Sequence, residues 1–372
     1  MKQKILGGII SLLLVFQGFS QVSNSGKLYV GTFTSEGAEG IYLCSFDFSN
    51  GEIELINTFK GIDNPSFLKI SPNRNYLYAV TRHPEKIEKS GGHIQGYKIK
   101  DDGDLEFLNK QVSHGSDPCH VDVSPDGNFA AIATYGGGTT SLYKINDDGK
   151  LSPASSTIIN EGSGPTSRQT APHAHAIKFS KNGKQAFSAD LGTDQLNIFD
   201  LKKDKLIPAK QPFVKLPPGS GPRHFDFHPN ADVTYVINEL NSTISVIEKK
   251  GRNLEVVQTI STLPENFSGT SYCADIHVSA NGKYVYGSNR GHNSIAVFKT
   301  DPVSKQLKFL TTVPTRGEWP RNFTLTNDGN FLLVANQHSG NIVVFKINTE
   351  TGIPEFSGKE LKLPAPVCLE FL

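Results

Sequence analysis

The 372-residue chain carries 37 Lys and Arg against 36 Asp and Glu, so its formal net charge is +1. This balance argues against a basic surface for nucleic acids and against a polybasic patch for membranes. Its 35 glycines and 21 prolines suit a protein built from many short strands and turns. The length alone would allow two domains, but all-β repeat folds often exceed that estimate within one domain.

The N-terminus has the pattern of an export signal. Two lysines precede an apolar run from Ile5 to Phe16, and Gly18-Phe19-Ser20 offers small residues at the cleavage positions. The apolar run is shorter than a bilayer span requires. We therefore expect a signal peptide over residues 1–20, and a periplasmic or secreted protein with no stable membrane insertion after cleavage. An uncleaved membrane anchor is the alternative.

A short phrase recurs six times beyond this leader, at intervals of roughly 50 residues. In each copy an apolar stretch runs into a turn of Ser, Pro, Asn, Asp and Gly residues, and then into a second apolar stretch. The turns open at Ser71, Ser124, Ser180, His228, Ser279 and Thr326. A third apolar stretch, a tight turn and a fourth stretch follow each copy. Four antiparallel strands at this interval are typical of a propeller blade.

The two ends of the chain supply a seventh blade. The segment that starts at Lys27 matches the second to fourth strands of a repeat, whereas the C-terminal PAPVCLEFL matches only a first strand. Pairing the two segments would remove two open sheet edges. The sequence therefore predicts an all-β, seven-bladed β-propeller over residues 27–372, as a single domain closed by its C-terminal strand.

The four cysteines do not form a disulfide framework in this arrangement. Cys119, Cys273 and Cys368 fall near the starts of the first strands of three different blades, and Cys44 falls in a third strand. We therefore expect buried free thiols. The chain also has no paired C-x-x-C zinc pattern, and we expect neither a metal site nor a cofactor.

Aligning the repeats on their turn openers reveals two columns in which the residue type varies. Five residues before the opener stand Ser66, Cys119, His175, Arg223, Ala274 and Arg321, and eleven after it stand Arg82, Tyr135, Leu191, Glu239, Arg290 and Gln337. The two columns lie symmetrically about the turn, so an antiparallel hairpin should bring them together at one end of the blade. The first strands line the central channel of a propeller, so both columns should gather at its mouth. We expect convergence of His175, Arg223, Arg321, Arg82, Glu239 and Arg290, with Tyr135, His120, His224, Asp190 and His338 near the rim.

These residue types suit attack on the carbonyl of a small anion. Arginine binds carboxylate or phosphate through two hydrogen bonds and can stabilise an oxyanion. A neutral imidazole can take a proton from water, and a carboxylate can orient it or an arginine. Structural roles remain open for each residue. Arg223 and Glu239 could form a plain ion pair, His175 could be a channel-wall residue, and each of the other arginines could cap a strand end.

Four segments, PHAHAIKFSKNGK, GPRHFDFHPN, NEL and YVYGSNRGHNSI, resemble the lactonase family of seven-bladed propellers. That family includes bacterial 6-phosphogluconolactonases of the propeller type and fungal muconate-lactonising enzymes. The resemblance covers residues 27–372 and implies that His175, Arg223 and Glu239 are the catalytic residues. Arg290 resembles a further anion-binding arginine of the family.

The expected function is therefore that of a hydrolase that opens a small anionic sugar lactone, as 6-phosphogluconolactonase does. Arg290, Arg321, Arg82, Tyr135 and His120 would bind the substrate. The family's best-known substrate is a cytosolic sugar phosphate, whereas this chain carries an export pattern, so the physiological lactone stays open. The alternatives are a lactonising cycloisomerase, a non-catalytic propeller binding module and a metal-dependent propeller lactonase.

Overall fold

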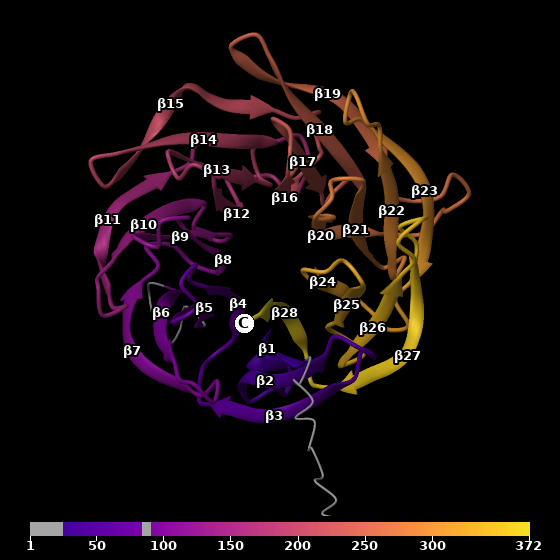
Figure 1. Cartoon of the computed structure of the whole chain (residues 1–372). Coiled ribbons are helices and arrows are strands. Elements are labelled where there is room, and N and C mark those ends of the chain that lie inside the picture. The colour runs from indigo at the N-terminus through magenta and orange to yellow at the C-terminus, as the bar shows by residue number, and fades with distance from the viewer. Residues whose placement is uncertain (1–24, 84–90) are drawn as a thin grey trace, which may run out of the picture.

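A computed structural model describes residues 25–83 and 91–372, which form seven four-stranded antiparallel sheets arranged around one axis (Figure 1). The predicted fold, a seven-bladed propeller with four strands per blade, is confirmed. The expected signal peptide lies outside the described residues. The described part of the chain contains no helix with the length and apolarity that a membrane crossing requires.

The strands occupy equivalent positions in every blade. The innermost strands are β4 (Pro65–Ile70), β8 (Pro118–Val123), β12 (Ala174–Phe179), β16 (Pro222–Phe227), β20 (Tyr272–Val278), β24 (Pro320–Leu325) and β28 (Pro366–Phe371). The second strands are β5 (Tyr76–Arg82), β9 (Phe129–Thr134), β13 (Gln185–Asp190), β17 (Val233–Asn238), β21 (Tyr284–Arg290), β25 (Phe331–Asn336) and β1 (Ser25–Thr32).

The outer half of each blade follows the same order. The third strands are β6 (Gly92–Ile99), β10 (Thr139–Ile145), β14 (Gln195–Lys202), β18 (Thr243–Lys250), β22 (Ser294–Thr300), β26 (Asn341–Ile347) and β2 (Gly40–Asp47). The outermost strands are β7 (Leu105–Val112), β11 (Leu151–Ile159), β15 (Lys205–Lys215), β19 (Asn253–Ser261), β23 (Leu307–Pro314), β27 (Pro354–Lys362) and β3 (Ile53–Lys60). A short 3₁₀ turn, η1 (Thr34–Glu36), follows β1.

The last strand closes the ring. In the seventh sheet β28 pairs with β1, so the order β28-β1-β2-β3 joins the two ends of the chain in one blade. Figure 1 shows the C-terminus near the axis, where β28 lies beside β1. The predicted closure by the C-terminal strand is therefore confirmed.

The repeated phrase forms the turn between the first and second strands. In the second copy, the Ser124 carbonyl accepts the N–H of Gly127 (2.8 Å), and the Ser124 hydroxyl accepts the N–H of Phe129 (2.9 Å). The same hydroxyl donates to the Asp126 carboxylate at 2.6 Å. Gly127 has a φ of +76°, a conformation that favours glycine, which explains the recurring Asp-Gly and Asn-Gly pairs.

Apolar side chains from adjacent blades pack against each other and form the core. Tyr78 and Val80 of β5, for example, pack with Val121 of β8 and Ile132 of β9. The tyrosine hydroxyls inside these layers reach backbone carbonyls of the next blade, as Tyr78 does at Gly149 (2.9 Å). The four cysteines are buried and free.

Each innermost strand is the edge of its sheet, so the backbone N–H groups that face the propeller axis need acceptors from outside the sheet. Side chains of the preceding blade supply them. The Asp122 carboxylate accepts the N–H of Phe179 (2.8 Å), and the Asp226 carboxylate accepts the N–H of Val278 (2.9 Å). The side chain of Glu370 receives the N–H of Ile70 in the same way at 3.1 Å. These contacts fix the spacing of the strands around the axis.

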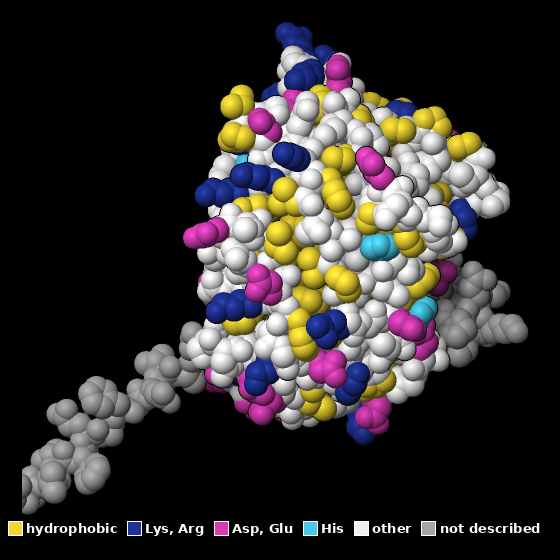
Figure 2. Space-filling view, turned by 90° about the vertical axis from the view of Figure 1, so that its right-hand side faces the viewer, with side chains coloured by type: hydrophobic (Ala, Val, Ile, Leu, Met, Phe, Trp, Pro, Cys, Tyr) yellow, Lys and Arg dark blue, Asp and Glu magenta, His cyan; other side chains and the backbone are white. Residues whose placement is uncertain are grey.

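The outer surface mixes both signs of charge. On the face shown in Figure 2, Lys and Arg side chains are interspersed with Asp and Glu, and apolar side chains gather down the middle of the face.

Candidate active site

Every innermost strand carries a β-bulge close to its start. In β16, Pro222 pairs with Asn238 and His224 pairs with Ile237, which leaves Arg223 as the extra residue. The equivalent residues of the other blades are Ser66, Cys119, His175, Ala274, Arg321 and Val367. A bulge redirects a side chain out of the regular alternation. The variable column five residues before the turn is therefore a ring of bulge positions, at the axial end that we call the mouth.

The regular pairs of the hairpin, such as Phe225 with Val236, lie one residue off the symmetry that would pair Arg223 with Glu239, and the bulge adds one more residue. Glu239 donates its N–H to the carbonyl of Gly221 (2.7 Å), so Gly221 and not Arg223 lies opposite it. Arg223 and Glu239 are therefore not paired directly, but they lie at the same end of the hairpin, as the alignment of the repeats predicts. Their side chains meet nevertheless, with Arg223 Nε 3.1 Å from Glu239 Oε2.

Glu239 is the centre of a cluster of arginines. Its Oε2 also lies 2.7 Å from Arg290 Nη2, and its Oε1 lies 3.0 Å from Arg168 Nη2. Glu239, Arg223 and Arg290 are 5%, 2% and 5% exposed. Burial opposes ionisation of Glu239, but the charges of Arg290, Arg223 and Arg168 together lower its pKa to about 2. The carboxylate is therefore ionised at neutral pH.

The backbone of the next blade holds two of these guanidiniums. Arg223 Nη1 donates to the Ala274 carbonyl (2.5 Å), and Arg290 Nη2 donates to the Cys273 carbonyl (2.8 Å). The Nε–H groups of both arginines are buried and have no aligned acceptor among the described residues. The 3.1 Å contact between Arg223 Nε and Glu239 is accordingly an ion pair without good hydrogen-bond geometry. The Nε–H of Arg290 is thus a buried donor without a partner among the described residues, whereas Arg223 Nε already contacts Glu239.

Positive charge exceeds negative charge at the mouth. One carboxylate, Glu239, faces three guanidiniums within ion-pair distance. Burial and the neighbouring Arg290 lower the pKa of Arg223 to about 10. Burial and the charges of Arg223, Arg290 and Arg82 lower the pKa of Arg321 well below its usual value. A bound anion would relieve this repulsion.

Arg82 of β5 and Arg321 of β24 belong to the two blades that flank the closing blade. Both guanidiniums contact the same aromatic ring. Their guanidinium carbons lie 5.3 and 5.0 Å from the ring centre of Phe33, within the range of a cation–π contact. Arg82 Nε also donates to the Pro118 carbonyl at 3.1 Å. Phe33 follows β1 and occupies, in the seventh blade, the position that Tyr135 and Glu239 occupy in theirs.

His175 lies beside this cluster with its Nδ1 buried and unpartnered. Burial and the charges of Arg223, Arg321 and Arg82 lower its pKa well below the usual value, so the ring is neutral at pH 7. Its ring centre is 5.7 Å from that of Tyr135, whose hydroxyl accepts a hydrogen bond from Arg168 Nη2 (3.1 Å). A neutral imidazole with an open ring nitrogen can accept a proton.

His120 lies one residue beyond the bulge of β8, away from the arginines. Its ring stacks on Phe67 at 4.0 Å between centres and meets His224 edge to face at 5.3 Å. Its Nδ1 is buried without a partner. Six of the eight residues that the sequence assigned to the site therefore form one cluster: His175, Arg223, Glu239, Arg290, Arg321 and Arg82. Tyr135 joins this cluster through Arg168. His120 belongs to the next layer along the axis.

The repeat alignment missed two residues of the cluster. Arg168 belongs to the segment between β11 and β12, which lies outside the repeated phrase, so no column contained it. Phe33 would have appeared if the second column had been extended to the seventh blade.

A metal-binding group or a groove near the cluster would also bear on the chemistry. Among residues 25–83 and 91–372, no group of three or more His, Cys, Asp or Glu side chains is placed to hold a metal ion. A groove of about 600 Å³ lies between two neighbouring blades, where Lys181, Asp200 and Lys249 contribute to its lining. It shares no residue with the arginine cluster.

Comparison with known proteins identifies the family. Residues 27–371 match the family model described as "Lactonase, 7-bladed beta-propeller". The chain belongs to this lactonase family. It is 35% identical to 6-phosphogluconolactonase of Bacillus subtilis over 92% of this chain and 97% of the relative, and 36% identical to 6-phosphogluconolactonase of Formosa agariphila over 87% and 93%.

Solved lactonase-like structures agree with the fold. The periplasmic gluconolactonase of Pseudomonas aeruginosa superimposes with a TM-score of 0.87 at 28% identity, covering 94% of this chain and 99% of that one. A Bacteroides fragilis crystal structure superimposes with a TM-score of 0.88 at 33% identity, covering 95% and 99%.

Proposed function

We propose that the protein is a hydrolase that opens a small anionic sugar lactone, with 6-phosphogluconolactone as the first substrate to test. The observation that carries the proposal is the buried Glu239 carboxylate held between Arg223 and Arg290, next to the neutral ring of His175. This arrangement combines an anion site with a proton acceptor. Membership of the lactonase family and the names of the relatives support it.

In the proposed reaction Arg223 and Arg290 bind the substrate through their guanidinium groups, together with Arg321. Their charges stabilise the oxyanion that forms when water adds to the lactone carbonyl. His175 takes the proton from that water as the new C–O bond forms. Collapse of the intermediate then breaks the ring C–O bond, and the leaving oxygen takes up a proton to give the hydroxy acid.

Glu239 does not act on the substrate in this scheme. Its carboxylate fixes the positions of Arg223 and Arg290 and balances part of their charge. Arg82, Tyr135 and His120 would contact other parts of the sugar, and no metal ion is needed. With the N-terminal pattern of an export signal, we propose that the enzyme acts outside the cytosol, as the Pseudomonas relative does by its name.

A panel of phosphorylated and free sugar lactones, followed by acid release on the purified mature chain, tests the proposal. We expect turnover of at least one lactone, unaffected by a chelator. The double variant His175→Ala/Arg223→Ala should lose at least about 100-fold in kcat/KM. Arg252→Ala, an exposed arginine in the turn before β19, is the control and should keep full activity.

Other outcomes would replace the proposal. Unchanged turnover in the double variant would remove these residues from the mechanism. Conversion of an unsaturated dicarboxylate into a lactone, without hydrolysis of the panel, would identify a lactonising cycloisomerase, in which His175 moves a proton to or from carbon. Absence of both activities would favour a binding module.

A further inference from the structure

Asp275 lies on β20 next to the bulge and is 3% exposed. Its Oδ1 accepts hydrogen bonds from His224 Nδ1 (2.7 Å) and from the N–H of Ile276 (3.0 Å). Its Oδ2 accepts hydrogen bonds from His277 Nε2 (3.1 Å), Asn322 Nδ2 (2.5 Å) and the N–H of Phe323 (3.3 Å). Although burial opposes ionisation, these neighbours hold the Asp275 pKa well below its usual value, so the group is a carboxylate.

This carboxylate fixes the tautomer of His224. Because Asp275 can only accept, the shared proton belongs to Nδ1 of His224, and Nε2 is left as the acceptor. Nε2 is buried and has no hydrogen-bond partner among the described residues. The arrangement is that of a histidine oriented by an acid, with its second nitrogen free for proton transfer.

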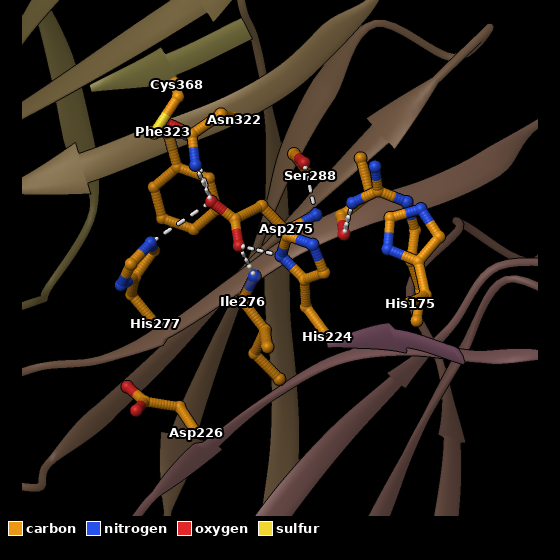
Figure 3. Close-up of polar contacts among 12 residues, drawn as sticks. His175, His224, Asp226, Asp275, Ile276, His277, Ser288, Asn322, Phe323 and Cys368 are labelled. Atoms are coloured by element: carbon orange, nitrogen blue, oxygen red, sulfur yellow. Dashed lines mark hydrogen bonds and ion pairs between the residues drawn. The ribbon is translucent and has the colours of Figure 1, made fainter. Parts of the chain in front are cut away.

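The free side of His224 faces the candidate active site. Figure 3 shows the ring of His224 between Asp275 and His175, and the ring centres of the two histidines are 5.3 Å apart. His224 follows Arg223 in the chain, so its backbone is fixed by the same bulge that places the arginine.

The charged and titratable groups around His224 come from four innermost strands. They are Asp275 on β20, Arg223 on β16, His175 and Lys178 on β12, and His120 on β8. Burial is the largest influence on the ring and, with Arg223 next, lowers its pKa to about 4, whereas Asp275 raises it. At His175 the principal neighbours are Arg223, His224, Arg321 and Arg82, and all of them lower its pKa.

The protonated form of His224 is therefore better stabilised by its neighbours than the protonated form of His175. An imidazolium at His175 would face the charges of Arg223, Arg321 and Arg82. An imidazolium at His224 would form an ion pair with the Asp275 carboxylate across 2.7 Å. An anion bound to Arg223 would cancel the main charge that opposes protonation of His224.

We propose that His224 and Asp275 form a proton relay behind His175, in which His224 takes over the proton that His175 removes from water. This inference rests on the proposed lactone hydrolysis. The water O–H bond breaks as its electron pair joins the carbonyl carbon, and His175 receives the proton on one ring nitrogen. His175 then releases a proton to Nε2 of His224, and the same path returns a proton for the leaving ring oxygen. His224 is a positioning and relay residue, since it does not touch the substrate.

The test compares single variants of the full mature chain on the best lactone of the panel. His224→Gln and Asp275→Asn should lower kcat by about 100-fold and leave KM within about twofold, because the relay takes no part in binding. The matched control is His228→Gln, a buried histidine just after the other end of β16 whose ring contacts the Gly282 carbonyl and the N–H of Asn230, and it should keep kcat within about twofold. Thermal unfolding of each variant shows whether it is folded.

Titration of the wild-type histidines by NMR provides a readout that needs neither turnover nor a variant. We expect His224 in the Nδ1–H form, with a pKa that rises by at least about one unit when 6-phosphogluconate, the product of the proposed reaction, saturates the site. An active enzyme whose His224→Gln variant keeps its kcat, or whose His224 titration is unchanged by the ligand, would overturn the relay and leave the hydrolase intact. A wild-type chain that hydrolyses no lactone would instead overturn the proposed function, and the relay with it.

Discussion

Glu239 and Arg290 form a buried ion pair between neighbouring blades. Glu239 directly follows β17, Arg290 ends β21, and their closest side-chain atoms, Oε2 and Nη2, are 2.7 Å apart. Both residues are 5% exposed. The pair therefore ties two blades together at the same place where the arginines are presented to the mouth, and it couples stability to the electrostatics of the candidate active site.

Replacement of the acid should destabilise the fold. Glu239→Gln leaves the buried guanidiniums of Arg223 and Arg290 without a counter-charge, and loss of one partner from a buried pair costs about 3 kcal/mol. Urea unfolding measures this loss, and added phosphate should restore part of it by supplying a counter-charge to the unpaired guanidiniums. Glu39→Gln is the control, because Glu39 pairs with Lys60 on the surface, where such a pair contributes little to stability. Equal effects of the two substitutions would contradict the prediction.

The same carboxylate predicts a pH dependence. Burial and the surrounding arginines leave the Glu239 pKa at about 2, below its usual value of 4.5. A depressed pKa contributes stability above the unfolded value, and that contribution is lost as the pH falls through the folded value. The difference in unfolding free energy between wild type and Glu239→Gln should therefore be largest near pH 7 and shrink steadily below about pH 4. A constant difference across urea titrations in this range would rule out an ionised Glu239.

Arg168 offers a test of substrate charge. Its side chain is 47% exposed, and it bridges Glu239 and the Tyr135 hydroxyl from the segment between β11 and β12. Arg168→Gln should raise KM for a phosphorylated lactone by about tenfold and change KM for the free lactone little, because a guanidinium binds phosphate strongly. Steady-state kinetics measure KM for both lactones, with Arg252→Gln as the control. Equal losses on both lactones would mean that Arg168 only positions Glu239.

The inner strands should be sensitive to loss of their side-chain acceptors. Asp226 binds Lys178 Nζ (2.9 Å) with one oxygen and the N–H of Val278 (2.9 Å) with the other. Asp226→Ala leaves both donors unpaired and should destabilise the protein by about 2 kcal/mol, with kcat of the folded protein unchanged. Asp148→Ala, on an exposed turn, should have little effect. A fall in kcat without a fall in stability would connect this layer to catalysis instead.

The fold could be predicted because its cause is local and repeated. The turn opened by Ser124 needs only a hydroxyl, an acid or amide, and a glycine in sequence, and the copies at Ser180, Ser279 and Thr326 follow the same scheme. The Ser71 copy has Arg74 at the positive-φ position, and the His228 copy uses its imidazole in place of the hydroxyl. Closure could be predicted from the missing first strand at Lys27 and the extra one at the C-terminus. Both conclusions depend on composition and order alone.

The candidate site could be predicted only in part. Arg223 and Glu239 were placed at the same strand end, but their register depends on a bulge, which leaves no mark in an alternating apolar pattern. Arg168 reaches the cluster from a non-repeated segment, so its contact with Glu239 depends on tertiary structure. The bond between His224 and Asp275 joins two blades, and no regularity within either blade indicates it.

The bulge residues at the mouth and the regularly paired residues of the innermost strands have different roles. Side chains on the regular part of each innermost strand pack against neighbouring blades, whereas the seven bulge residues, from Ser66 to Val367, vary in type, and two of them, Cys119 and Arg223, also reach backbone carbonyls of the next blade. Exchanging a residue at one of the other bulge positions should change the chemistry presented at the mouth with less effect on the contacts between blades. Substitutions at these bulge positions could therefore alter which ligand the mouth binds while the propeller fold is kept. A small combinatorial library restricted to these positions would test this.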